Sequence, residues 1–265
     1  MRRRTLRALA AALFAALAAG CAGDAPLPEP TLQSQTMTGE SSDPRNRARV
    51  RTELATLYYS AGNMSVALEE LRLALQADPS YALAYSLLGA VYMELRENQL
   101  AQQNFERALR LAPNDPEINH RYGWFLCQSG REVESVRYFQ QAIRNPLYPT
   151  PWRSSAAAGV CVLRKGMLKE AEEYFAAALR QDPDDPVSLV NLADIRYRKG
   201  ELEEARRLVA RFNRLVEPTA ESLWLALRIE RKLGERTAEA ALANQLRRRF
   251  PASREYQLLQ RGEYD

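Results

Sequence analysis

A cysteine-containing helical pattern occurs twice in the middle of this chain, and the distance between its two copies limits the possible folds. The first copy runs from Asn119 to Gly130 and the second from Ala156 to Gly166. Their cysteines, Cys127 and Cys161, lie 34 residues apart. A period of 34 residues is typical of stacked helix-turn-helix repeats, each of which buries its apolar face only against a neighbour. The sequence therefore predicts an all-α array of such repeats.

Small and bulky residues at fixed positions extend this period on both sides of the central pair. Gly or Ala stands at the eighth and twentieth positions of a repeat, and a bulky residue stands at the twenty-fourth. Small residues let the two helices of a repeat approach closely, and a Pro stops the second helix because it cannot continue the hydrogen-bond ladder. Asp115-Pro116 and Asp185-Pro186 favour new helix starts, with Asp as the N-cap and Pro at the first helical position. The pattern resembles the tetratricopeptide repeat.

This resemblance implies an α-solenoid, or superhelix, of about six tetratricopeptide repeats over residues 48–253. The sixth repeat is expected to cap the array, because Leu227 stands where a small residue is usual. The C-terminal tail, residues 254–265, is expected to add a short final helix. The register slips by two residues before the fourth repeat, so the expected repeats are 48–81, 82–115, 116–149, 152–185, 186–219 and 220–253.

The charge of the chain is concentrated at its N-terminus. The formal net charge is +4, but four of the 37 basic residues precede residue 8 and no acidic residue precedes Asp24. The remaining 33 basic residues balance the 33 acidic ones. A nucleic-acid-binding protein normally carries a clustered basic surplus that neutralises phosphates, so this balance argues against nucleic acid as a partner.

Residues 1–20 are predicted to be a lipoprotein signal peptide. An arginine cluster precedes an apolar run from Ala8 to Ala19, which is shorter than the ~20 residues that a membrane-spanning helix needs. The segment from Leu17 to Cys21 resembles the lipobox of bacterial lipoproteins, which implies a covalent lipid on Cys21. We expect no cofactor besides this lipid. Ala22, in place of Asp, favours the outer membrane by the same resemblance. Cleavage by ordinary signal peptidase, which would leave Cys21 as a free thiol, is the alternative.

Residues 21–47 have the composition of a flexible linker. They include four prolines and many Ser, Thr and Gln residues, and they are too poor in apolar residues to form a core. A lipid on Cys21 followed by such a linker would let the repeats stand off from a membrane surface.

Catalytic and metal sites find little support in the sequence. The chain has one histidine, His120, and the motif and the strand-turn-helix context of a nucleophilic serine are absent. One histidine and the two cysteines of the array do not supply the four ligands of a structural zinc site, and phosphate-loop and dinucleotide fingerprints are absent. We therefore predict a protein that is not an enzyme.

The first helices of the stacked repeats are expected to line a concave groove that binds a partner segment. Such grooves bury an apolar stripe of an extended or helical peptide and pair its polar groups at the edges. The side chains predicted to face this groove in the first three repeats are Thr52, Thr56, Tyr59, Ser86, Ala90, Met93, His120 and Trp124.

Cys127 and Cys161 are interpreted as a disulfide pair. Two unpaired thiols on adjacent repeats of an exported protein would meet an oxidising environment. The cysteines stand at positions 12 and 10 of successive first helices, which are neighbours in the stack. The alternative is two separately buried free cysteines that act as small apolar residues.

The cysteines, the insert and the lipobox together resemble one particular family. The elements are Asn119-x-x-Tyr-Gly-Trp-Phe-Leu-Cys127, the insert that begins at Asn145-Pro-Leu-Tyr, and Ala-Gly-Val-Cys161. They are similar to the type IV pilus biogenesis lipoproteins called PilF or PilW. The family resemblance implies a pilotin, an outer-membrane lipoprotein on the periplasmic face. Such a protein helps the pilus secretin to reach that membrane and oligomerise, or stabilises the pilus fibre system.

The family resemblance also sets the expected partners. These are the pilus secretin subunit and other envelope assembly proteins, with attachment to the membrane through the lipid anchor. Two other functions stay open at this point. One is a general scaffold lipoprotein for outer-membrane or peptidoglycan machinery, and the other is an enzyme-associated role that would depend on His120.

Overall fold

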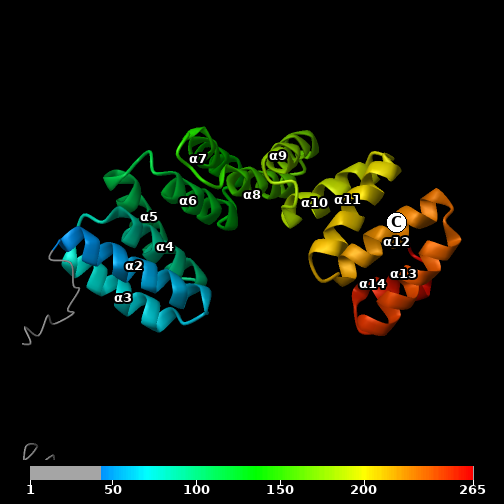
Figure 1. Cartoon of the computed structure of the whole chain (residues 1–265), viewed down its shortest axis with the longest axis horizontal. Helices are drawn as coiled ribbons and strands as arrows, with labels where there is room; N and C mark the ends of the chain where they lie inside the picture. The colour runs from blue at the N-terminus through cyan, green and yellow to red at the C-terminus, as the bar shows by residue number, and fades with distance from the viewer. Residues whose placement is uncertain (1–42, 265) are drawn as a thin grey trace, which may run out of the picture. The chain divides into compact units, whose positions relative to one another are not determined.

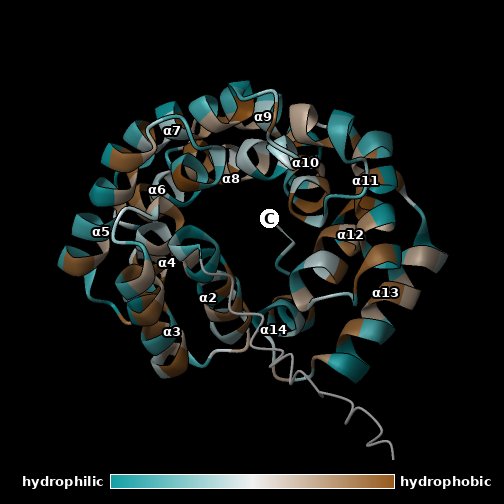
Figure 2. Cartoon of the chain, turned by 60° about the vertical axis from the view of Figure 1, so that its left-hand side comes forward, coloured by the Kyte–Doolittle hydropathy of each residue, from teal (hydrophilic) through white to brown (hydrophobic). Residues whose placement is uncertain are grey.

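Two rows of helices make up the part of the chain that the structure, a computed structural model, describes, which is residues 43–264. Helices that alternate along the chain fall into an inner row and an outer row of a curved array (Figures 1 and 2). The inner row contains α2 (Pro44–Ser60), α4 (Ala82–Glu94), α6 (Pro116–Gln128), α8 (Pro151–Arg164), α10 (Pro186–Arg198) and α12 (Ala220–Leu233).

The outer row contains the second helix of each repeat, and one further helix follows it. The outer helices are α3 (Met64–Ala77), α5 (Asn98–Leu111), α7 (Glu132–Arg144), α9 (Leu168–Gln181), α11 (Leu202–Leu215) and α13 (Arg236–Arg249). The short helix α14 (Arg254–Arg261) ends the described chain. Strands are absent from residues 43–264. The predicted all-α solenoid is therefore confirmed.

The predicted helix starts follow from capping. The Asp115 carboxylate accepts a hydrogen bond from the Ile118 amide at 3.0 Å, and the Asp185 carboxylate accepts one from the Ser188 amide at 2.8 Å. Each satisfies an amide that has no partner within its own helix. The two Asp-Pro starts are therefore confirmed.

The predicted boundary between linker and repeats is wrong by four residues. Helix α2 begins at Pro44 rather than at residue 48, because Asp43 caps it and accepts a hydrogen bond from the Arg45 amide at 3.1 Å. Proline composition suggested a linker here, but a Pro in the first helical turn after an N-cap favours a helix start. The signal peptide, Cys21 and the rest of the linker lie outside the described residues.

The spacing of the fourth repeat differs for a local reason. Residues 145–150 connect α7 to α8, whereas residues 112–115 make the corresponding connection from α5 to α6. In the longer connection the Asn145 side chain accepts a hydrogen bond from the Leu147 amide at 2.9 Å, and Tyr148 is buried. The two additional residues therefore form an ordered turn, and α8 starts at Pro151.

Residue volumes are complementary between the two helices of every repeat. A Cβ atom added to Gly159 would lie 2.7 Å from the ring of Phe175, and Gly89 and Gly123 similarly leave room for Phe105 and Phe139. In the first and fifth repeats Ala takes the place of Gly and faces a residue smaller than Phe. In the sixth repeat the large residue is on the first helix and the Ala is on the second. These pairs are Ala55 with Leu71, Ala193 with Val209, and Leu227 with Ala243.

Candidate functional site

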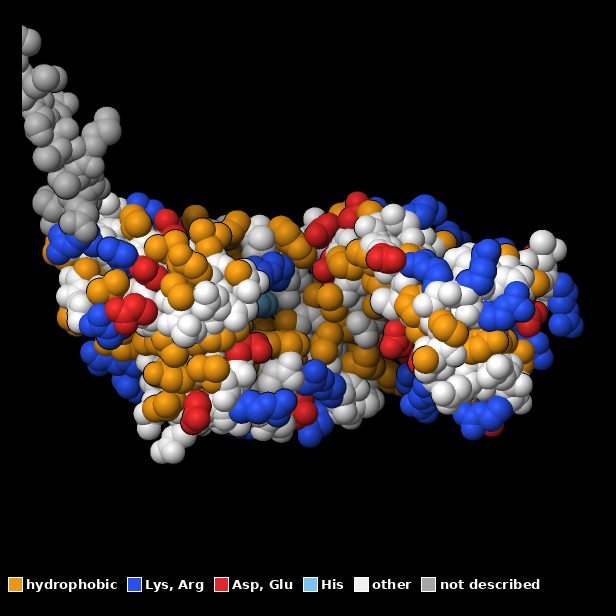
Figure 3. Space-filling model, turned by 90° about the horizontal axis from the view of Figure 1, so that it is seen from below, with side chains coloured by type: hydrophobic (Ala, Val, Ile, Leu, Met, Phe, Trp, Pro, Cys, Tyr) orange, Lys and Arg blue, Asp and Glu red, His pale blue; other side chains and the backbone are white. Residues whose placement is uncertain are grey.

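A groove of about 550 Å³ lies on the inner row of helices. Its walls come mainly from α2, α4, α6 and α8, and the start of α10 closes one side. Hydrophobic side chains gather in the hollow of the face drawn in Figure 3, with Lys, Arg, Asp and Glu side chains around it. An apolar floor with charged edges suits a peptide segment with an apolar stripe.

Six of the eight residues predicted for the groove lie in its wall. They are Thr56, Tyr59, Ala90, Met93, His120 and Trp124. The predictions for Thr52 and Ser86 are wrong, since these side chains are only 6% and 0% exposed and lie outside the groove lining. The Thr52 hydroxyl donates to the Ala48 carbonyl of its own helix at 2.8 Å. Both share a repeat position with His120, and the longer imidazole reaches the groove where their short side chains stay buried.

The fourth repeat also contributes to the groove, which the sequence-based prediction did not include. Val160 occupies the same ninth position as Thr56, Ala90 and Trp124, so the register of the repeats contained the signal. The two-residue slip before α8 obscured it. The additional lining residues near His120 and on α8 are Glu117, Arg121, Arg153, Ala156, Ala157 and Val160.

Charges in the groove are only partly paired. The Arg121 guanidinium lies 3.1 Å from the Glu117 carboxylate in an ion pair within α6. Arg153 is exposed in the groove wall and forms no ion pair with any residue in the range 43–264. The Tyr59 hydroxyl donates to the Glu94 carboxylate at 3.5 Å, and burial, followed by this negative charge, raises the pKa of Tyr59. The Arg153 guanidinium is therefore a cation of the groove that a partner carboxylate can neutralise.

His120 joins the third and fourth repeats at the floor of the groove. Its Nδ1 lies 2.8 Å from the Ser154 hydroxyl, and its ring meets Phe139 edge-on with 5.8 Å between centroids. Ser154 is fully buried, so a substrate carbonyl has no access to its hydroxyl. The pair is suited to holding two repeats together. Burial lowers the pKa of His120 to about 4, with Glu117 opposing this shift and Arg153 and Arg121 adding to it.

The lowered pKa of His120 predicts a pH-dependent stability. Above pH 6.5 the ring is neutral in both states, but between pH 6.5 and about 4 only the unfolded chain binds the proton. Stability is therefore lost as the pH falls through this window. We expect the free energy of unfolding to fall by roughly 2 kcal/mol. This is less than the full pKa shift of His120 would give, because the ring borders an open groove. Urea unfolding of the wild type and of His120→Asn at pH 7 and pH 4 measures it. An identical pH dependence in both proteins would contradict the prediction.

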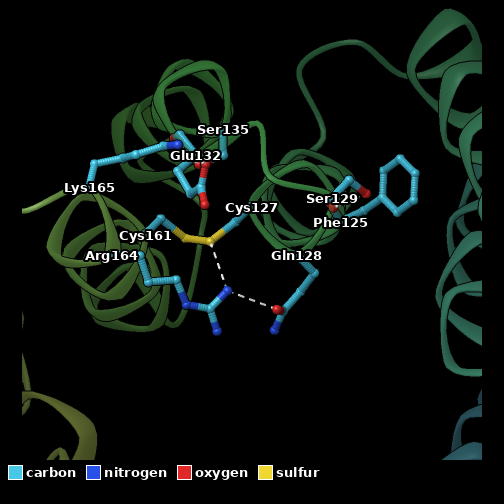
Figure 4. Close-up of a disulfide and its surroundings, with 9 residues drawn as sticks. All are labelled: Phe125, Cys127, Gln128, Ser129, Glu132, Ser135, Cys161, Arg164 and Lys165. Carbon is cyan, nitrogen blue, oxygen red and sulfur yellow. Dashed lines mark hydrogen bonds and ion pairs between the residues drawn. A yellow bond between two sulfur atoms is a disulfide. The ribbon is translucent and has the colours of Figure 1, made fainter.

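A disulfide joins the inner helices of the third and fourth repeats next to the groove. Cys127 on α6 and Cys161 on α8 have bonded sulfurs at 2.10 Å and Cα atoms 5.8 Å apart (Figure 4). Arg164 extends beside the bond and donates a hydrogen bond to the Gln128 side chain at 2.9 Å. The pair lies in a buried cluster that also contains Phe139 and Ala158, and Trp124 of the groove packs against this cluster. The disulfide thus supports one wall of the groove.

The described residues offer neither a metal site nor a membrane-spanning helix. Within residues 43–264, side chains that could act as ligands do not cluster as a metal ion requires. None of the described helices combines the length and the apolar character needed to span a bilayer.

Comparison with known proteins assigns the repeats. Models described as tetratricopeptide repeat match residues 82–115, 128–186 and 162–216, and one described as TPR repeat matches residues 55–95. These matches cover most of the helical array, so the resemblance to the tetratricopeptide repeat is confirmed.

The chain is also similar to individual proteins along nearly its whole length. It is 30% identical to the type IV pilus assembly protein PilF of Pseudomonas aeruginosa over 258 residues, which are 97% of this chain and 98% of PilF. A solved structure of Pseudomonas aeruginosa PilF matches with a TM-score of 0.78 at 29% identity, over 83% of this chain and 99% of that one.

A second solved structure agrees with this similarity. It is the crystal structure of PilW, a widely conserved type IV pilus biogenesis factor, with a TM-score of 0.71 and 32% identity over 80% of this chain and 98% of that one. The chain therefore belongs to the PilF and PilW family of tetratricopeptide-repeat proteins of type IV pilus biogenesis.

Proposed function

We propose that the chain is an outer-membrane lipoprotein that acts as a pilotin, an assembly factor for the type IV pilus secretin. The observation that carries this proposal is the amphipathic groove on the inner row of an array that is similar to PilF along 97% of this chain. In this mechanism the lipid on Cys21 localises the protein to the outer membrane, and the groove binds a segment of the secretin subunit. The protein itself is not catalytic.

The lipid part of the mechanism rests on the sequence Leu17-Ala-Ala-Gly-Cys21 and on the linker that follows it. One acyl chain gives only marginal membrane binding, whereas two or more hold a protein stably at the surface. Lipoprotein processing adds three chains to the cysteine, which is sufficient for a permanent anchor. The polar linker then lets the groove reach a secretin subunit before that subunit enters the outer membrane.

Replacing Cys21 by serine tests whether the lipid localises the protein. We expect Cys21→Ser to leave the protein outside the outer-membrane fraction and to leave secretin multimers scarce or in the inner membrane. Membrane fractionation with detection of the protein and of secretin multimers in each fraction measures both. Normal outer-membrane multimers in this variant would refute the pilotin mechanism.

The groove part of the mechanism predicts a position-specific loss of partner binding. Val160 is half-buried in the groove wall, whereas Val133 on α7 is 64% exposed and lies outside the groove lining. A carboxylate at position 160 would have to be desolvated when an apolar segment docks, which costs several kcal/mol when it is unpaired. We therefore expect Val160→Glu to weaken binding to the secretin subunit at least tenfold and Val133→Glu to leave it unchanged.

A crosslinking experiment with the same two glutamate variants distinguishes a pilotin from a general envelope scaffold. Crosslinking from the groove in membranes, followed by identification of the captured protein, decides between a secretin and another envelope protein. Capture of a peptidoglycan enzyme or of an outer-membrane assembly protein, with the secretin absent, would favour the general scaffold. If both glutamate variants captured the secretin equally, the groove would not be the surface that binds it.

A further inference from the structure

A second site lies on the inner row at the far end of the array, on helix α12. Trp224, Arg228 and Arg231 stand at the fifth, ninth and twelfth positions of the sixth repeat. The corresponding positions of the first and third repeats include Thr56, Tyr59, His120 and Trp124, which line the groove described above. Residues four and seven positions apart share one face of a helix, so α12 presents its three side chains together.

This site is filled by the chain's own C-terminal tail. The ring of Tyr264 stacks on Trp224 with 5.5 Å between centroids and an interplanar angle of 18°. On the Tyr264 ring the Arg231 guanidinium lies 3.8 Å from the centroid. A stacked aromatic pair with a guanidinium over the ring combines aromatic and cation–π attraction. Trp224 is only 7% exposed as a result of packing that includes this tail.

The register of the repeats explains how the tail reaches the site. Helix α14 starts at Arg254, 34 residues after the start of α12, so it occupies the place of a seventh first helix. It ends early at Gly262, which adopts a left-handed conformation with φ of 71°. Glycine accepts this conformation without the strain that a Cβ atom would cause. The chain therefore turns back, and Tyr264 returns to α12.

The tail is held loosely enough to be displaced. Helix α14 contains no fully buried residue, although Leu258 and Leu259 pack against the cluster around Trp224. Segments with little buried apolar surface open with small free energies. The tail can therefore leave the site without unfolding the repeats that form it.

The cations of the site indicate which ligand it prefers. Arg228 lies over the rings of Tyr197 and Trp224, at 4.8 and 5.9 Å, and its Nε is buried without a hydrogen-bond partner. The nearest carboxylate to Arg228 in an ion pair, that of Asp194, is 4.0 Å away. The Arg231 guanidinium, in contrast, already pairs with the Glu239 carboxylate at 2.7 Å, so Arg228 is the cation that a ligand carboxylate can neutralise. A ligand that carries an acidic group beside an aromatic ring would match this arrangement. The tail sequence Gly262-Glu-Tyr-Asp265 has this composition.

We propose that Trp224, Arg228 and Arg231 form a binding site for an aromatic residue flanked by acidic residues. The chain occupies this site with Tyr264 until a partner segment of the same chemistry displaces the tail. The site is separate from the groove on α2 to α8, and it gives the array a second contact point whose use depends on release of the C-terminus.

Competition between the tethered tail and a free peptide tests the proposal. The probe is a fluorescein-labelled peptide with the sequence of residues 257–265, and the proteins are the full chain and its Tyr264→Ala variant. A flexible tether gives its ligand a local concentration in the millimolar range, which the free peptide must overcome. We expect the peptide to bind Tyr264→Ala about tenfold more tightly than the wild type or Tyr264→Phe.

Two further variants assign the binding to α12. In the Tyr264→Ala background, Arg231→Gln is expected to weaken peptide binding at least fivefold. Arg72→Gln, which changes a guanidinium on α3 that is 54% exposed and pairs with Glu69, is expected to leave binding unchanged. Circular dichroism melting of each protein shows whether the helical array is folded. Equal affinity of the peptide for the wild type and Tyr264→Ala, or equal affinity of the two glutamine variants, would overturn the proposal.

Discussion

Replacing both Cys127 and Cys161 by alanine is expected to lower the free energy of unfolding by about 3 to 4 kcal/mol. The bond closes a loop of 34 residues, and the chain-entropy model gives this magnitude for a loop of that length. Contacts in a repeat array are made between neighbours, so the loss acts mainly at the junction of the third and fourth repeats. Urea unfolding followed by circular dichroism measures the change.

The disulfide variant also has a recognisable unfolding profile. Loss of coupling at one junction divides an array into two units that unfold less cooperatively, so the transition should broaden as well as move to lower urea. A matched control carries Cys21→Ser alone, which removes a thiol outside the repeats. Thiol titration of the oxidised, unfolded Cys21→Ser protein should find no free thiol. Two free thiols would contradict the pairing, and the expected loss of stability would then have no basis.

The sequence predicted those parts of the fold that depend on neighbouring residues or on the repeat period. Asp115 and Asp185 mark helix starts because an N-cap acts on amides within three residues of it. Period and residue size together predicted which helices pair. The start of α2 was missed because Pro44 resembles the prolines of the linker before it, and only the structure shows that Asp43 caps the helix.

The candidate site was less predictable, because the depth of a side chain in the array depends on its length as well as on its position. Ser86 and His120 share one repeat position, yet the hydroxyl of Ser86 is buried and the imidazole of His120 reaches the groove. The contact between Trp224 and Tyr264 depends on the point at which α14 ends, and neither residue type indicates it. Periodicity identifies the faces of the helices, and only the structure shows which side chains meet.

Substituting Gly159 by alanine is expected to lower the free energy of unfolding by roughly 1 to 2 kcal/mol, although alanine favours helices. The added Cβ would lie 2.7 Å from the fully buried ring of Phe175, and overpacking of this kind costs about 1 to 3 kcal/mol. The higher helix propensity of alanine offsets up to about 1 kcal/mol of this. Urea unfolding of the wild type and Gly159→Ala measures the difference.

A second substitution should recover much of this loss. Phe175→Leu alone leaves a cavity beside Gly159 and should cost about 1 to 2 kcal/mol. In combination the two substitutions recreate the Ala55 and Leu71 pair of the first repeat, which packs without exposed surface. The double variant should therefore lose less stability than the sum of the single losses, with a coupling energy of about 1 to 2 kcal/mol. Additive losses would contradict this account, because they would mean that the volumes of positions eight and twenty-four are set independently. A measured coupling would instead show that the side-chain volumes at these two positions are matched within each repeat. It would also explain why the sixth repeat tolerates Leu227 opposite Ala243.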